Sequence, residues 1–222
     1  MVIAIDGPGG VGKSTVSSRV AAALGLPHLD TGSTYRAAGL MALRCGATVA
    51  DAGAVVEAIR NADIAIDLGA VSIDGVDVTE ELRNDEVTAA SSAVATHPEV
   101  RADIVALQRA WVVGHGGSAV VEGRDIGTVV FPDAPVKIYL TARPEVRAAR
   151  RSNDAEAASK SQEQIAAELA ARDHVDSTRA ASPLRPADDA VIIDTSNLDI
   201  EAVVARVLEV VRRVDSRRHR PI

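Results

Sequence analysis

The residues with the clearest chemical meaning lie in the segment Gly-Pro-Gly-Gly-Val-Gly-Lys-Ser-Thr at positions 7–15. Gly7, Gly12, Lys13 and Ser14 fit the spacing G-x-x-x-x-G-K-[ST], the pattern of a loop that surrounds nucleotide phosphates. Glycines let the backbone bend tightly, so that successive N–H groups point at phosphate oxygens. Lys13 would place a positive charge on the β- and γ-phosphates, and the Ser14 hydroxyl could bind Mg²⁺. The predicted triphosphate site consists of Gly7, Pro8, Gly9, Gly10, Val11, Gly12, Lys13, Ser14 and Thr15.

The residues around this segment provide the strand and helix that such a loop requires. Residues 1–6 form a short apolar run, long enough for one buried strand of a parallel sheet. After the loop, Val16, Val20 and Leu24 recur at helical spacing, and Gly25 predicts the end of that helix. The helix would direct the positive end of its dipole at the bound phosphates. An ordinary glycine-rich turn is the alternative, but it does not account for this strand–loop–helix order.

Composition is typical of a globular α/β protein. The chain has 222 residues, of which 47% are hydrophobic and 25% charged, enough for one domain with small inserted lobes. With one Trp, two Tyr and one Phe, the core must be built from Ala, Val, Ile and Leu, and base stacking on single-stranded nucleic acid is disfavoured. A net charge of −7 also disfavours general affinity for nucleic acid or anionic membranes.

Two further features bear on location. No apolar run approaches the length of a membrane span, and Asp6 interrupts the N-terminal run too early for a signal peptide. The single Cys45 cannot form an intrachain disulfide and fits a reducing compartment. We therefore expect a cytoplasmic protein without nucleic-acid or membrane partners, and we expect it to be a monomer.

An arginine near the start of a helix suggests a second anion site. Thr31 or Ser33 can cap a helix in whose first turn Arg36 lies. A cation is unfavourable there because a helix N-terminus already carries partial positive charge. An anion that binds to Arg36 would explain the position, although a solvated surface charge is the alternative. His28 lies on the short strand predicted just before this helix, and we expect it to have a structural role rather than a catalytic one.

Residues 50–85 interrupt the alternation of strand and helix. Residues 71–78 alternate apolar and polar side chains around Asp74-Gly75, which predicts a β-hairpin. An antiparallel hairpin fits badly inside a parallel series, so we interpret this region as a separate lobe. Helical spacing resumes at Glu86, and Pro98 divides the helical region into two segments.

The second half of the chain carries polar residues directly after a buried strand. Residues 118–122 predict this strand, and Arg124 and Asp125 follow it. Ligands bind at the carboxyl ends of parallel strands, so both residues are candidates for a binding site. A structural ion pair between them is the alternative. Residues 136–140 and 190–194 predict further strands.

Charged side chains then gather around a polar stretch. Arg147, Arg150 and Arg151 precede residues 152–161, a pattern that favours a phosphate clamp beside a mobile loop. A solvated helix face is the alternative.

A later helix is predicted to start near Gln162 and to run to about Asp173. Arg172, Asp176 and Arg179 follow the spacing i, i+4 and i+7, which places them on one helix face. The alternative for this trio is a surface ladder of salt bridges.

Several of these motifs together resemble the bacterial cytidylate (CMP) kinases, which belong to the P-loop nucleoside monophosphate kinases. GRDIGT with VFPDAPVKIYL is specific to this family, whereas the P-loop alone indicates only a nucleoside triphosphate. Glu122 stands where Asp is also common in the family, and Thr31 stands where Ser is frequent. Both replacements keep the same functional group, a carboxylate and a hydroxyl. The resemblance covers nearly the whole chain in family order and is carried by GPGGVGKST, LDTGSTYR, EVTAASSAVATHPEVR, EGRDIGTVVFPDAPVKIYL, RAARR and RDHVDSTRAASPL.

The resemblance implies an α/β fold with a five-stranded parallel sheet flanked by helices, an inserted lobe that binds the monophosphate, and a short lid. It implies one kinase domain over residues 1–222. The expected divisions are a core of 1–30, 101–146 and 161–222, a lobe of about 31–100, and a lid of about 147–160.

The resemblance also implies roles for single residues. Base recognition would fall to Ser92, Arg101 and Asp125. Catalysis would depend on charges close to the transferred phosphoryl group, with the lid arginines closing on it; these residues are Lys13, Arg124, Arg147 and Arg151. The substrate-binding residues would be Thr31, Arg36, Ser92, Arg101, Arg124, Asp125, Arg172, Asp176 and Arg179.

The implied reaction is ATP + CMP → ADP + CDP, with dCMP as a further acceptor and with Mg²⁺ bound by Ser14. A P-loop kinase for UMP or for a hydroxylated metabolite is one alternative. A GTP-dependent switch is the other, although the chain lacks the Asn-Lys-x-Asp sequence that would recognise guanine.

Overall fold

The computed structural model describes residues 1–67, 69–153 and 161–218, and the chain divides into two compact units. The first unit contains Met1–His28 and Val112–Ile222, and the second contains Leu29–Trp111. The expected boundaries of the core, the lobe and the lid stay predictions, and the helix Pro98–Gly114 contains the boundary between the two units.

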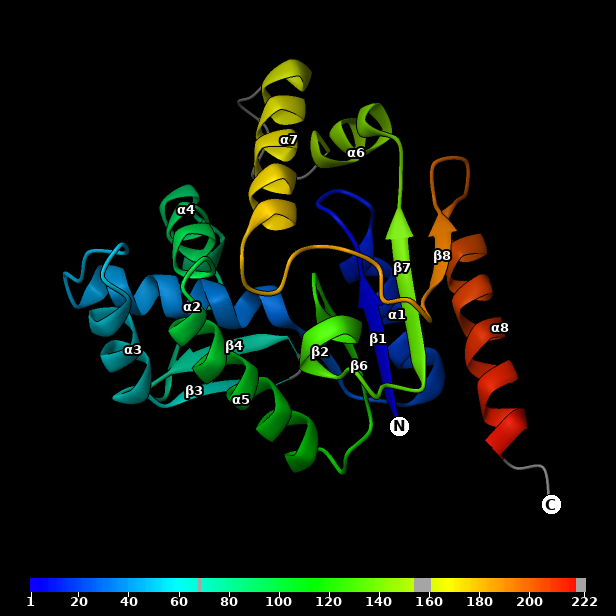
Figure 1. Cartoon of the computed structure of the whole chain (residues 1–222), viewed down its shortest axis with the longest axis horizontal. Helices are drawn as coiled ribbons and strands as arrows, with labels where there is room; N and C mark the ends of the chain where they lie inside the picture. Colours follow the sequence, from blue (N-terminus) through cyan, green and yellow to red (C-terminus); the bar gives the residue numbers. More distant parts are fainter. Residues whose placement is uncertain (68, 154–160, 219–222) are drawn as a thin grey trace. The chain divides into compact units, whose positions relative to one another are not determined.

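A five-stranded sheet has the strand order β2-β6-β1-β7-β8, and all of its strands lie in the first unit except for the last two residues of β2. β1 pairs in parallel with β6 on one side and with β7 on the other, and β7 pairs in parallel with β8 (Figure 1). The sequence-based prediction of a parallel α/β sheet is therefore confirmed. The strands are β1 (Val2–Asp6), β2 (His28–Asp30), β6 (Ala119–Gly123), β7 (Val136–Thr141) and β8 (Val191–Asp194).

Two helices complete the main core of this unit. Val16 and Val20 of α1 (Lys13–Leu24) pack in one buried cluster with Val203 and Val207 of α8 (Ile200–Arg218). Strand residues join the same cluster, and its buried members are Ala, Val, Ile and Leu, as the aromatic-poor composition predicted. The cluster fixes the ends of β1 and α1, and with them the loop that joins the two elements.

The chain between β6 and β8 forms the remaining elements of the first unit. After β6 comes a π-helical turn, η2 (Ile126–Val130), then β7 and the helices α6 (Pro144–Arg151) and α7 (Gln162–Thr178). A side-chain capping box of Ser161 and Gln164 starts α7, which runs beyond the predicted end near Asp173. Residues 154–160, most of the expected lid loop, lie outside the described residues.

The second unit combines helices with a small antiparallel sheet of order β3-β4-β5. The predicted hairpin is confirmed: Asp74 (φ 52°) and Gly75 (φ 76°) form the turn that joins β4 to β5. Pro98 divides the helical region as expected, because α5 begins at that residue. The elements are α2 (Thr31–Arg44), α3 (Ala52–Arg60), β3 (Ile64–Asp67), β4 (Ala70–Ile73), β5 (Val76–Asp77), the 3-10 turn η1 (Glu81–Arg83), α4 (Asp85–Val94) and α5 (Pro98–Gly114).

One helix start differs from its prediction. Asp30, not Thr31 or Ser33, caps α2, because its Oδ1 accepts the backbone N–H of Gly32 at 2.8 Å. A carboxylate at this position also favours the helix dipole. Among the described residues, no helix combines the length and apolar character that a membrane span requires.

Candidate functional site

The loop 7–12 lies between the end of β1 and the start of α1. Gly12 takes a left-handed conformation (φ 90°) directly before Lys13. Gly10 is also left-handed (φ 75°), and a Cβ there would lie 2.9 Å from the carbonyl oxygen of Arg147. The Lys13 ammonium donates to the carbonyl oxygen of Pro8 at 2.8 Å, which holds the side chain against the loop. The predicted segment therefore makes tight turns at glycine positions, as an anion-binding loop requires.

A buried carboxylate lies beside the start of α1. The Ser14 hydroxyl donates to Oε2 of Glu122 at 3.1 Å, and Glu122, on β6, is only 1% exposed. Nε2 of His28 lies 3.1 Å from the other oxygen of the same carboxylate. Sequence reasoning noted Glu122 only as a family variant and missed its contact with Ser14, because the two residues are 108 positions apart.

These two oxygen-bearing side chains have the chemistry of a Mg²⁺ site. Mg²⁺ prefers hard oxygen ligands and usually binds through one or two protein groups together with substrate phosphates and water. Ser14 and Glu122 offer a hydroxyl and a carboxylate side by side at the loop. In the described part of the chain there is no cluster of three or more His, Cys, Asp or Glu of the kind that forms an all-protein metal cage.

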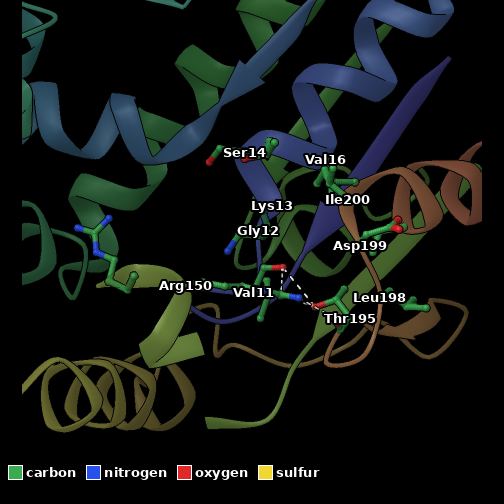
Figure 2. A pocket seen from close by; sticks show the side chains of 14 residues that line it. Val11, Gly12, Lys13, Ser14, Val16, Arg150, Thr195, Leu198, Asp199 and Ile200 are labelled. Carbon is green, nitrogen blue, oxygen red and sulfur yellow. Dashed lines mark hydrogen bonds between the residues drawn. The ribbon is translucent and has the colours of Figure 1, made fainter. Parts of the chain in front are cut away.

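A cavity of about 610 Å³ opens at the loop (Figure 2). Arg150 closes one part of its wall: the guanidinium donates to the carbonyl oxygen of Val11 at 3.3 Å and to that of Thr195 at 2.7 Å. The lining residues are Gly10, Val11, Gly12, Lys13, Ser14, Thr15, Val16, Arg150, Arg151, Thr195, Leu198, Asp199, Ile200 and Val203.

The part of this wall that follows β8 was missed by sequence reasoning. Thr195, Leu198 and Asp199 come directly after that strand. The signal that could have found them is the rule already applied to β6, that ligands bind at the carboxyl ends of parallel strands.

Two of the predicted lid arginines occupy different surroundings. Arg151 lines the cavity. Arg147 does not; it is 7% exposed, donates to the carbonyl oxygen of Gly9 at 3.1 Å and pairs with Asp173 of α7. In this structure Arg147 therefore contacts the loop through the carbonyl of Gly9, and its closure on a phosphoryl group stays a prediction.

A cluster of charges joins the end of β6 to the end of α7. Arg124 donates from Nε to Oδ2 of Asp176 at 2.8 Å and from a terminal nitrogen to the carbonyl oxygen of Gly7 at 3.0 Å. Arg179 lies 3.4 Å from the other oxygen of Asp176. Arg124 therefore forms an ion pair with Asp176. The sequence had suggested a structural ion pair between Arg124 and Asp125 as the alternative to a binding role.

The geometry of α7 modifies the predicted helix face. Arg172 and Asp176 are one turn apart on the helix, but α7 ends at Thr178 and Arg179 is its C-cap in an extended conformation. Arg179 reaches Asp176 because the chain turns there, and its Nε donates to the carbonyl oxygen of Ser182. Arg179 therefore lies beyond the end of the helix face on which the spacing placed it, although it still contacts Asp176.

Asp125 lies at the start of η2, where a second buried carboxylate orders the backbone. Asp6, at the end of β1, accepts the N–H groups of Ile126 and Gly127 at 2.8 Å each. Asp6 and Asp125 are both 4% exposed. Burial raises the pKa of Asp6 to about 6, against the lowering effect of the two N–H donors. Sequence reasoning treated Asp6 only as the end of a strand.

The remaining predicted substrate residues belong to the second unit. Arg36 pairs with the capping residue Asp30 at 2.8 Å. Arg101 is 4% exposed, and its guanidinium lies 5.2 Å from the ring centre of Tyr35. Thr31 is buried at the start of α2, and the hydroxyl of Ser92 donates to the carbonyl oxygen of Thr88 within α4. Arg36 therefore lies in the second turn of α2 and not in its first turn as predicted, because Asp30 caps the helix. Arg101 contacts the ring of Tyr35 on the same helix.

A P-loop after the central strand of a five-stranded parallel sheet, with a basic cavity at that loop, is typical of the P-loop nucleotide-binding proteins. A sequence model of cytidylate kinase matches residues 3–213, and the chain belongs to the cytidylate kinase family. The resemblance inferred from the motifs is therefore confirmed.

Individual relatives agree with this assignment. The chain is 50% identical over 216 residues to the cytidylate kinase of Mycobacterium leprae, covering 96% of both chains. It is 50% identical over 217 residues to the cytidylate kinase of Rhodococcus opacus, covering 95% of this chain and 94% of the relative. A crystal structure of an uncharacterized protein from Eubacterium ventriosum is similar with a TM-score of 0.51 at 12% identity, covering 97% and 98% of the two chains. That likeness concerns the fold alone.

Proposed function

We propose that this chain transfers the γ-phosphoryl group of ATP to CMP and releases ADP and CDP. The observation that carries the proposal is the P-loop with its 610 Å³ cavity, in a chain that belongs to the cytidylate kinase family. We propose dCMP as a further acceptor, because it presents the same base and the same phosphate.

The acceptor decides what catalysis must supply. A phosphate oxygen of CMP is largely deprotonated at neutral pH, so the reaction needs no general base. What remains is to bring two anions together, hold them in line and neutralise the charge of the transferred group.

Residues of the first unit are suited to this task. The backbone N–H groups of the loop and the Lys13 ammonium would hold the ATP phosphates. Arg151, which lines the cavity, is suited to contact the transferred group, and Arg147 would keep the loop in shape through Gly9. Arg124 would contribute charge from the β6 side, where Asp176 orients it.

Ser14 and Glu122 are the residues that we propose for Mg²⁺. When bound, the cation would neutralise phosphate charge. The Ser14 hydroxyl can donate its proton to Glu122 and still offer its lone pairs to a cation.

For the acceptor site, we propose that Asp125 accepts a hydrogen bond from the exocyclic amino group of cytosine. Ser92 and Arg101 would complete base recognition. The CMP phosphate or the nearby base edge would be held by Arg36, Arg124 and Arg179. The ribose would be held by Arg172 with Asp176. Thr31 is assigned to the same site.

The alternatives are separated by one assay. ADP release is measured by a coupled enzyme reaction with ATP and Mg²⁺, with CMP, dCMP, UMP or no acceptor, and then with GTP in place of ATP. We expect rapid turnover with CMP and dCMP and little with UMP. Turnover of UMP at the rate of CMP would overturn the substrate assignment. Acceptor-independent hydrolysis of GTP would favour a switch. The same preparation on a sizing column tests the expected monomer.

A further inference from the structure

A short chain of hydrogen bonds links an edge strand of the sheet to the phosphate-binding loop. His28 is the first residue of β2, Glu122 lies on the neighbouring strand β6, and Ser14 lies in the first turn of α1. Nε2 of His28 is 3.1 Å from Oε1 of Glu122, and the Ser14 hydroxyl is 3.1 Å from Oε2. Each oxygen of one carboxylate therefore has its own contact.

The chemistry of the carboxylate determines which atoms carry protons. An ionised carboxylate accepts hydrogen bonds and cannot donate them. Toward an ionised Glu122, Nε2 of His28 and the Ser14 hydroxyl would both act as donors. The Ser14 proton then points at Glu122, and the lone pairs of the same oxygen are directed elsewhere.

The packing explains why Glu122 needs such a contact. Val120, two positions earlier on β6, belongs to the buried cluster with Val16 and Val20 of α1, so Glu122 faces α1 as well. Glu122 is 1% exposed, whereas the His28 side chain is 23% exposed. A carboxylate so deeply buried depends on its donors for orientation, because water cannot replace them.

We propose that His28 is a positioning residue for the metal-binding hydroxyl: it holds the Glu122 carboxylate so that Ser14 turns its lone pairs toward a phosphate-bound Mg²⁺. The proposal rests on the proposed function, because it presumes that a metal–ATP complex binds at the loop. His28 itself would touch neither substrate nor metal. The family resemblance assigns no role to this position, and sequence reasoning favoured a structural one.

The variant His28→Phe tests this proposal, because it keeps a ring of similar size but removes the donor. His28→Gln restores an N–H near the position of Nε2. A matched control is His97→Phe, because Nε2 of His97 also makes a partly buried hydrogen bond, to the carbonyl oxygen of Val49 in the second unit. Should His28→Phe fail to fold, His28→Leu provides the same comparison with a smaller side chain.

The measurement is the binding of ATP by calorimetry, once with Mg²⁺ and once with EDTA, in the absence of any acceptor. Groups that orient a metal ligand typically change metal affinity or activity by about 10–100-fold when they are lost. We expect His28→Phe to weaken ATP binding about 10-fold with Mg²⁺ and less than about 2-fold with EDTA. His28→Gln should recover most of the loss, and His97→Phe should match the wild type in both conditions.

Two results would overturn the proposal. Unchanged Mg²⁺-dependent affinity in folded His28→Phe would mean that His28 does not act on the Ser14 hydroxyl. An equal loss with Mg²⁺ and with EDTA would indicate a general structural role. CMP is absent from this assay. If CMP is not the acceptor, the coupled ADP-release assay will show it, and the result of the ATP-binding test will still be interpretable.

Discussion

Arg124 donates to Asp176 at 2.8 Å and thereby connects the loop after β6 with helix α7. The same guanidinium reaches the carbonyl oxygen of Gly7 at the start of the P-loop. Residues from three distant segments of the first unit therefore share one charged cluster. Asp176, which is 9% exposed, accepts from two arginines in this cluster and is the residue on which its geometry depends.

Removal of the Asp176 carboxylate should affect both stability and acceptor binding. Asp176→Asn removes the negative charge that Arg124 and Arg179 share, and we expect a loss of about 1–3 kcal/mol in the free energy of unfolding. The KM for CMP should rise more than the KM for ATP. Urea unfolding and steady-state kinetics measure the two effects. The control is Asp103→Asn, which breaks the exposed ion pair with Arg60 and should lower the free energy of unfolding much less. Equal losses in the two variants would contradict the role given to Asp176.

Lys13 should matter for turnover and little for folding. Lys13→Ala removes a positive charge that the ATP phosphates require, and we expect kcat to fall by at least about 10²-fold, the scale of one lost transition-state contact. Circular dichroism and thermal unfolding should match the wild type. Arg19→Ala, an exposed change on the same helix α1, serves as the control and should keep normal turnover. Near-normal kcat in folded Lys13→Ala would remove this residue from the mechanism.

Asp125 should decide between cytosine and uracil. Cytosine presents an amino donor where uracil presents a carbonyl acceptor, and a carboxylate can accept from the first but repels the second. We expect Asp125→Ala to raise the KM for CMP well above any change for ATP. It should also reduce the CMP-to-UMP ratio of kcat/KM by about 10-fold or more, because such a contact is worth about 1–3 kcal/mol. An unchanged ratio in a folded variant would show that another residue reads the base.

Asp6 should make stability depend on pH in a definite direction. Burial raises its pKa from 3.8 to about 6, so the folded protein binds the proton more tightly than the unfolded chain. The stabilisation from that proton is fully present below about pH 4 and is lost as the pH rises through 6, a change of about 3 kcal/mol. Asp6→Asn, which is always neutral, lacks this dependence.

The measurement for Asp6 is urea unfolding of the wild type and of Asp6→Asn at several pH values between 4 and 7. The wild type should lose stability relative to the variant as the pH increases across this range. Parallel curves for the two proteins would mean that the pKa of Asp6 is not raised in the folded state.

Features that depend on close neighbours along the chain could be predicted from the sequence by itself. The P-loop is one, because its glycines, Lys13 and Ser14 lie within a few residues and the flanking apolar spacing indicates the strand and helix. The Asp74-Gly75 turn is another, because left-handed backbone at two successive positions is a local requirement that these residue types meet. The break at Pro98 follows in the same way from the missing N–H and the fixed φ of proline. The family motifs, read in order, indicated the parallel sheet and the family itself.

Only the tertiary structure determined which polar groups meet across long separations. Arg147 carries the same charge as Arg151 four positions later. Arg147 nevertheless contacts the carbonyl of Gly9 in the loop, whereas Arg151 lines the cavity. His28 and Glu122 are 94 positions apart, and Asp6 and Ile126 are 120 apart. Such contacts depend on strand order and register, because parallel neighbours in a sheet are distant in the chain. Local spacing therefore identified the phosphate loop, whereas packing of the sheet decided which carboxylates and arginines hold it.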